Sequence, residues 1–143
     1  MKVLLISLLW LIVPPLNWMG KFDEALKQAA EVHKPILINF SGSDWCGPCI
    51  RLSAEIFESD VFEKYAGEHL LLVRADFPRQ KKNRLSAEQT KLNEALAERY
   101  NPEGKFPYTV LVDEKGKVMR SWEGFPGEGP EAFIAQIARS GSK

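Results

Sequence analysis

Short apolar runs alternate with stretches of helical periodicity along this chain of 143 residues, and the alternation limits the folds open to it. Runs of strand length occupy residues 36–40, 70–77, 108–113 and 118–124. Amphipathic or capped helical patterns occupy residues 22–32, 50–57, 60–67, 86–100 and 130–137. Strands separated by helices predict parallel βαβ units, and the last two strands, joined by a tight turn, predict a hairpin. The sequence therefore predicts one α/β domain, a three-layer α/β/α sandwich around a central mixed sheet.

The first residues are a different kind of sequence. A single basic residue, Lys2, precedes an almost wholly apolar run at 3–13, and two prolines at 14–15 end that run. A basic start, an apolar stretch of about 7–15 residues and a breaker are typical of a signal peptide. A membrane-spanning helix needs about 20 apolar residues, so the run is short for a stable span. No small-x-small triplet follows it to mark a cleavage site.

Two outcomes are open for this leader. It is either a signal peptide that is removed at residues 15–20, or an N-terminal anchor that holds the protein on the outer face of the cytoplasmic membrane. In both cases residues 1–16 are the leader and residues 17–143 form the folded domain. We expect the protein to be periplasmic or otherwise exported.

The charge balance narrows the range of partners. Lysine plus arginine and aspartate plus glutamate number 19 each, so the chain is formally neutral. A neutral chain lacks the electrostatic attraction that nucleic acid or an anionic membrane surface exerts on basic proteins. We therefore expect no nucleic-acid partner, and membrane attachment only through residues 3–13. Separately, we expect the protein to be a monomer.

The only two cysteines, Cys46 and Cys49, lie in the stretch 44-DWCGPCI-50. A disulfide between residues so close closes a small ring, which adds little stability because the entropic gain grows with loop length. The pair follows a buried strand and opens a helix, where free N–H groups and the helix dipole favour the thiolate and lower a cysteine's pKa from about 8.5 to about 3.5–7.5. Thiolate is the attacking species in thiol–disulfide exchange.

The position of each residue in the motif predicts its role. Cys46, at the junction of loop and helix, is expected to be exposed and to act as the nucleophile. Cys49, one turn into the helix, is expected to be more buried and to resolve the mixed disulfide. Pro48 lacks an N–H, which costs little in the first helical turn. Gly47 leaves room for a substrate backbone, and Trp45 offers an apolar surface beside the sulfur.

Three other interpretations of the pair stay open at this point. A structural zinc site needs four ligands, and only His33 and His69 could complete the set, without zinc-finger spacing. A purely structural disulfide is the second. The third is a non-catalytic module that binds a partner or delivers a metal. The redox interpretation requires no metal and no cofactor other than the Cys46–Cys49 pair itself.

The motif in its setting resembles the active site of the thioredoxin family. Trp45 to Cys49 reads WCGPC, and the preceding strand, the following helix and Phe106-Pro107 before a strand hairpin repeat the order of that fold. The stretch 34-KPILINFSGSDWCGPC-49 is similar to exported bacterial thioredoxin-like disulfide reductases and isomerases. The resemblance implies a thiol–disulfide oxidoreductase that acts on protein thiols and disulfides and is recharged by an unidentified electron donor. It also implies that Pro107 is a cis proline facing the cysteines, and that Phe106 offers backbone groups to the substrate.

The chain departs from the family pattern in two places. The resemblance places a buried acid in the strand before the motif, where this chain has Asn39, which cannot act as a base. Asp44, Glu55, Asp76 or a water molecule could substitute for it. The basic stretch 78-PRQKKNR-84 lies in a longer connection than thioredoxin has; such a loop is ordinarily solvated, although its cations could dock a partner. Ser86 and Gln89 after it are spaced as a capping box.

Overall fold

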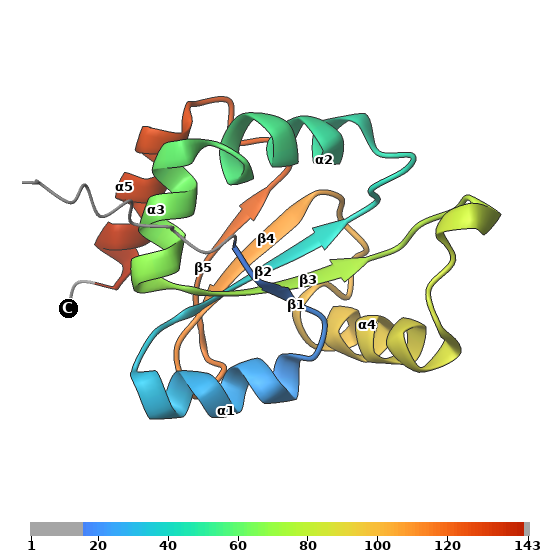
Figure 1. Cartoon of the computed structure of the whole chain (residues 1–143), viewed down its shortest axis with the longest axis horizontal. Helices are drawn as coiled ribbons and strands as arrows, with labels where there is room; N and C mark the ends of the chain where they lie inside the picture. Colours follow the sequence, from blue (N-terminus) through green and yellow to red (C-terminus); the bar gives the residue numbers. More distant parts are fainter. Residues whose placement is uncertain (1–15, 142–143) are drawn as a thin grey trace, which may run out of the picture.

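The computed structural model describes residues 16–141, and it has helices on both faces of a five-stranded sheet (Figure 1). The strands are β1 (Trp18–Met19), β2 (Ile36–Ser41), β3 (Leu71–Asp76), β4 (Tyr108–Val112) and β5 (Val118–Glu123). The helices are α1 (Phe22–Val32), α2 (Gly47–Leu52), the π-helical turns η1 (Ser53–Phe57), α3 (Asp60–His69), the short 3₁₀ helix η2 (Lys81–Asn83), α4 (Ala87–Tyr100) and α5 (Pro130–Ser140). The predicted three-layer α/β/α fold with a mixed sheet is confirmed.

The order of strands across the sheet is β1-β3-β2-β4-β5. Strand β2 pairs parallel to β3 on one side and antiparallel to β4 on the other, and β4 and β5 form the predicted antiparallel hairpin. Because β2 and β3 run in the same direction, the connections that leave them emerge from the same edge of the sheet (Figure 1). The loop to the cysteine motif follows the end of β2 at this edge, and the basic loop follows the end of β3 beside it.

Each face of the sheet has its own hydrophobic core, because side chains alternate along a strand. In β2, Ile36, Ile38 and Phe40 join a cluster under α1 and α4, whereas Leu37 joins a cluster under α2, α3 and α5 (Figure 1). Complete burial of such side chains stabilises the fold by about 1.5–3 kcal/mol each. The second core supports the helix that carries the cysteines.

The structure differs from the sequence prediction in three local features. Strand β1 was not predicted, because a two-residue strand shows no periodicity. The helix after the motif does not continue as a regular α-helix through Phe57: it widens at Ser53, whose carbonyl accepts the N–H of Glu58 at 2.9 Å. Ser86 caps α4 as expected, but Gln89 does not return the bond and instead donates to the carbonyl of Gly20 at 2.8 Å.

The predicted leader, residues 1–16, lies outside the described residues except for its last position. Among the helices of residues 16–141, none combines the length and the apolar character needed to span a membrane.

Candidate active site

Cys46 and Cys49 form a disulfide at the start of α2, with their Cα atoms 5.2 Å apart. Cys46 is the N-cap residue of the helix, and its Sγ accepts the N–H of Cys49 at 3.3 Å. The Sγ of Cys49 accepts a hydrogen bond from the N–H of Gly42 at 3.5 Å. Both sulfurs therefore face backbone donors, which stabilise negative charge on a sulfur when the disulfide opens.

The two cysteines differ in exposure less than expected. Cys49 is 2% exposed, but Cys46 is only 6% exposed, so the prediction of an exposed Cys46 is wrong. In the disulfide, the sulfur of Cys46 is bonded to Cys49 and turned toward the helix N-terminus, which removes most of its surface from solvent. Gly47 and Pro48 remain exposed and mark the side from which the disulfide is reached.

Trp45 is held over the loop that enters the motif. Its Nε1 donates to the carbonyl of Phe77 at 2.7 Å, and its ring meets the ring of Phe106 edge-on with centroids 5.4 Å apart. A Cβ at Gly42 would overlap the indole of Trp45, so only glycine permits this approach. Trp45 thus joins the loop after β3 and the segment before β4 to the cysteine motif.

The Phe106–Pro107 peptide bond is cis, the isomer that the family resemblance implied. The residue that follows, Tyr108, pairs with Phe40 at the end of β2, directly before the loop to the cysteines. The carbonyl of Pro107 accepts the N–H of Gly124 at 2.9 Å, while Phe106 contacts Trp45. The two predicted substrate-binding residues therefore lie beside the motif.

A polar row crosses the sheet on the face that α2 covers. Asn39 is 2% exposed and stands between Arg74 of β3 and Thr109 of β4 in the strand register, and its Nδ2 donates to the Oγ1 of Thr109 at 3.2 Å. The guanidinium of Arg74 lies 4.2 Å from the ring centroid of Trp18 and donates to the Oγ of Ser53 at 3.3 Å.

Arg74 is an unusual cation for such a position. Burial lowers its pKa, although Asp76 and Glu58 act in the opposite direction, and its Nε is buried without a partner among the described residues. Where the family pattern has a buried acid, this face of the sheet therefore has a buried amide next to a partly buried cation.

The three carboxylates proposed as substitutes for that acid are each bound to another group. Glu55 pairs with Arg51, with its Oε1 3.0 Å from the Nε, on the exposed side of the helix. Asp76 accepts the backbone N–H of Ser43 at 2.9 Å. Asp44 accepts the N–H groups of Arg79 and Gln80 at 2.9 Å each.

The sequence prediction missed three residues that shape the site: Gly42, Arg74 and Phe77. It named Arg79 only among the loop cations that could dock a partner, and not as a contact of Trp45. Gly42 and Arg79 lie in loops, where hydrophobic periodicity gives no information about contacts. Arg74 follows the buried Leu72 on the same inward face of β3, and a cation after an apolar residue on that face is the signal that could have drawn attention to it. The contact between Arg79 and Trp45, 3.7 Å from guanidinium carbon to ring centroid, joins residues far apart in sequence.

The zinc interpretation receives no support from the described residues. His33 lies against Glu114 and His69 against Glu68, and no group of three or more potential metal ligands occurs in residues 16–141.

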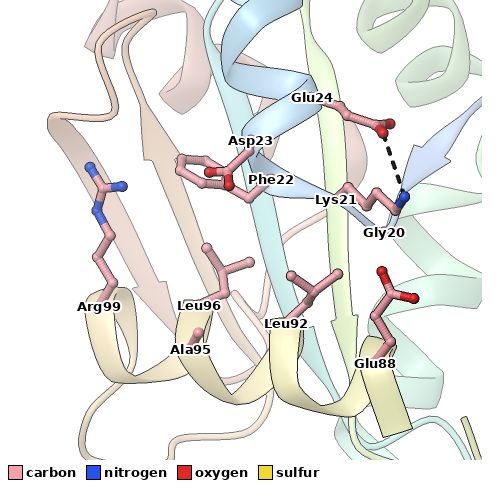
Figure 2. A pocket seen from close by; sticks show the side chains of 10 residues that line it. All are labelled: Gly20, Lys21, Phe22, Asp23, Glu24, Glu88, Leu92, Ala95, Leu96 and Arg99. Carbon is pink, nitrogen blue, oxygen red and sulfur yellow. Dashed lines mark ion pairs between the residues drawn. The ribbon is translucent and has the colours of Figure 1, made fainter. Parts of the chain in front are cut away.

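A separate groove lies between the start of α1 and α4, where Phe22, Leu92 and Leu96 face one another among charged side chains (Figure 2). It lies on the face of the sheet opposite to α2 and contains none of the motif residues.

Comparison with known proteins agrees with this geometry. The family model of the thioredoxin-like domain matches residues 22–139. The chain is 38% identical over 122 residues to the disulfide bond reductase DsbH of Chlamydia pneumoniae, a match that covers 85% of this chain and 70% of that protein. It is also 34% identical to the thioredoxin-related protein DsbJ of the same organism, over 54% of this chain but only 25% of that protein.

Solved structures give the same result. A structure of the DsbH oxidoreductase superposes with a TM-score of 0.81 at 34% identity, covering 90% of this chain and 85% of that one. A disulphide isomerase from Xylella fastidiosa shares the fold, with a TM-score of 0.61 at 22% identity over 82% of this chain and 88% of that one. The chain belongs to the thioredoxin-like family.

Proposed function

We propose that this protein is an exported thiol–disulfide oxidoreductase that reduces or isomerises disulfides of other proteins. The observation that carries the proposal is the Cys46–Cys49 disulfide at the start of α2, next to Trp45 and the cis Phe106–Pro107 bond. The similarity to a protein named as a disulfide bond reductase supports the same conclusion.

Cys46 is the nucleophile in this proposal and Cys49 the resolving thiol. When the disulfide is reduced, the Cys46 sulfur keeps its place at the N-cap, where the N–H of Cys49 and the helix dipole favour the thiolate. Cys49 is the more buried of the two, as suits a thiol that reacts only within the mixed disulfide. Trp45, Gly47 and Pro48 support the pair without taking part in bond exchange.

The reaction balances as two exchanges. The Cys46 thiolate attacks one sulfur of the substrate disulfide, forming a mixed disulfide and releasing the other substrate sulfur as a thiolate, which takes up a proton. Cys49 loses its proton and attacks Cys46, which releases the second substrate thiol and leaves the Cys46–Cys49 disulfide. Two electrons and two protons have then passed to the substrate, and a dithiol donor outside the protein must return them.

The substrate backbone is expected to lie along the segment before β4. This expectation is supported by the contact of the Phe106 ring with Trp45, which places Phe106 close to Cys46 in space. An extended substrate chain can pair with backbone groups there while its disulfide reaches Cys46.

Export is supported by the N-terminal sequence. A basic residue, an apolar run at 3–13 and two prolines form a leader of signal-peptide type. We propose that the domain works in the periplasm, either released or held on the outer face of the membrane by that leader.

The decisive test exchanges each cysteine for serine and measures reduction of insulin disulfides by the purified protein. Cys46→Ser should abolish the reaction, because no nucleophile remains. Cys49→Ser should accumulate mixed disulfides, visible on non-reducing gels, because the resolving step is blocked. Full activity of Cys46→Ser would refute the mechanism.

The direction of electron flow follows from the reduction potential of the pair. A potential near about −270 mV indicates a reductase, and one of about −120 to −180 mV indicates an oxidase or isomerase. We expect the lower value, because Gly47-Pro48 between the cysteines resembles the reducing members of the family. Equilibration with glutathione and dithiothreitol buffers measures it.

A further inference from the structure

The loop after β3 places a dense positive charge beside the active site. Residues 79–84, here called the cationic segment, contain four basic residues and no acidic one. The four are all exposed: Arg79, Lys81, Lys82 and Arg84. The ion pairs among residues 16–141 are made by other basic residues. Figure 1 shows the segment extending from the edge of the sheet at which α2 begins.

The cationic segment is fixed to the cysteine motif by Asp44, two residues before Cys46. The Asp44 carboxylate accepts the backbone N–H groups of Arg79 and Gln80 at 2.9 Å each and the Nδ2 of Asn83 at 3.0 Å. The backbone carbonyl of Asp44 accepts the Nε2 of Gln80 at 3.3 Å. These hydrogen bonds hold the backbone of the cationic segment against the cysteine motif. The basic residues of the segment therefore stay close to the disulfide.

Arg79 places a positive charge in direct contact with the motif. Its guanidinium carbon lies 3.7 Å from the centroid of the Trp45 ring, and Trp45 precedes Cys46 directly. Asp44 and Asp76 on this side bind backbone N–H groups of the loops, and a third carboxylate, Glu94, lines a hollow together with Arg84 and Lys91. With Lys91 counted, five basic groups stand against these three carboxylates. The net charge on this side of the site is therefore positive.

On the opposite side of the site, carboxylates outnumber basic side chains. Lys105, next to Phe106, pairs with two carboxylates, Glu103 at 3.0 Å and Glu123 at 3.2 Å. A substrate that lies across the site thus meets positive charge on the side of the cationic segment and a small excess of negative charge near Phe106.

We propose that the cationic segment selects substrates, so that the protein acts preferentially on disulfides with aspartate or glutamate residues beside them. This inference rests on the proposed oxidoreductase function and adds a substrate class to it. Complementary charge raises the rate of encounter and orients the partner, and salt screens it over about 8 Å at physiological ionic strength. The preference is therefore expected in kcat/KM and is expected to weaken as salt is added.

The test uses the reduced full chain and three synthetic peptides that share one disulfide ring and differ only in flanking residues: aspartate, asparagine or lysine. The wild-type kcat/KM should fall in that order, by roughly tenfold between the aspartate and lysine peptides at low salt. The variant Lys81→Glu/Lys82→Glu should lose most of this ratio. Comparing this variant with the wild type on the same peptide removes the contribution of the intrinsic reactivity of that disulfide.

The matched control is Lys115→Glu/Lys117→Glu, which makes the same change of charge in the exposed turn between β4 and β5, at the other end of β4 from the site. It should keep both the wild-type activity and the wild-type preference. Equal kcat/KM of the wild type for the aspartate and lysine peptides overturns the inference while the proposed function stands. A control that loses the preference as fully as Lys81→Glu/Lys82→Glu also overturns it. Failure to reduce any of the three peptides overturns the proposed function as well.

Discussion

Asp44 shows how one side chain can organise an active-site border without touching the sulfurs. Its carboxylate binds the N–H of Arg79, the side chain of Asn83 and the N–H of Gln80, and these bonds lower its pKa from the usual 3.8 against the opposing effect of burial. A carboxyl whose pKa is lowered in the folded state stabilises the fold above its unfolded pKa. That contribution is lost as the pH falls through the lowered value.

Asp44→Asn tests this role. At neutral pH the variant should unfold more easily than the wild type and exchange the amide hydrogen of Gln80 faster, because an amide offers only one acceptor oxygen. As the pH falls below about 4 the difference should shrink, first because the carboxyl of the unfolded chain is protonated and then, below the lowered pKa, because that of the folded protein is. Denaturant unfolding at both pH values measures it, with the exposed Glu98→Gln as control. A difference that does not change with pH would contradict the argument.

At the scale of elements, α4 is joined to the sheet by a chain of amides. Gln89 donates to the carbonyl of Gly20 and to the Oδ1 of Asn93, each at 2.8 Å. Asn93 is 2% exposed and donates to the carbonyl of Asp76, the last residue of β3, at 2.9 Å. The helix therefore supports the strand end from which the cationic segment departs.

Asn93→Ala should destabilise the protein by about 1–3 kcal/mol, because the carbonyl of Asp76 loses the Asn93 donor and the amide of Gln89 loses one of its two acceptors. The neighbouring Glu94 is exposed, and Glu94→Ala should change stability by less than about 0.5 kcal/mol. Urea unfolding of both variants gives the comparison. Equal effects would mean that helix propensity, and not the buried amide, accounts for the loss.

At the scale of the whole molecule, the redox state and the stability of the fold are linked. The free energies of unfolding of the oxidised and reduced forms differ by the difference in potential between the folded and the unfolded cysteine pair, about 1.4 kcal/mol for each 30 mV. A reductase has a folded pair that gives up electrons readily. Its oxidised form is therefore the more stable one.

We expect the oxidised protein to melt at a higher temperature than the reduced protein. Calorimetry of both forms, with and without dithiothreitol, measures the difference, and Cys46→Ser/Cys49→Ser serves as the control that should not respond to the reductant. A reduced form that is more stable than the oxidised one would indicate an oxidant, as in family members whose reduced state is stabilised.

The order of elements and the chemistry of the motif were both accessible from sequence, because each rests on local patterns. Ser86 caps α4 as its sequence context predicts, and Ser59 likewise caps α3. Strand β1 escaped prediction because two residues carry no pattern. The reciprocal bond of the capping box, between the Gln89 side chain and the backbone N–H of Ser86, does not form. Gln89 instead donates to the carbonyl of Gly20, which belongs to a distant segment of the chain.

The redox pair could be assigned from the sequence, since Cys46 and Cys49 are the only cysteines and their spacing allows one small ring. The surroundings of the pair, in contrast, depend on the tertiary structure. It buries Cys46 almost as deeply as Cys49, places Asn39 beside the cation of Arg74, and ties the basic loop to Asp44. This division arises because caps, periodicity and motif spacing are local properties of the chain. Parallel pairing of β2 and β3, in contrast, brings together two loops more than thirty residues apart.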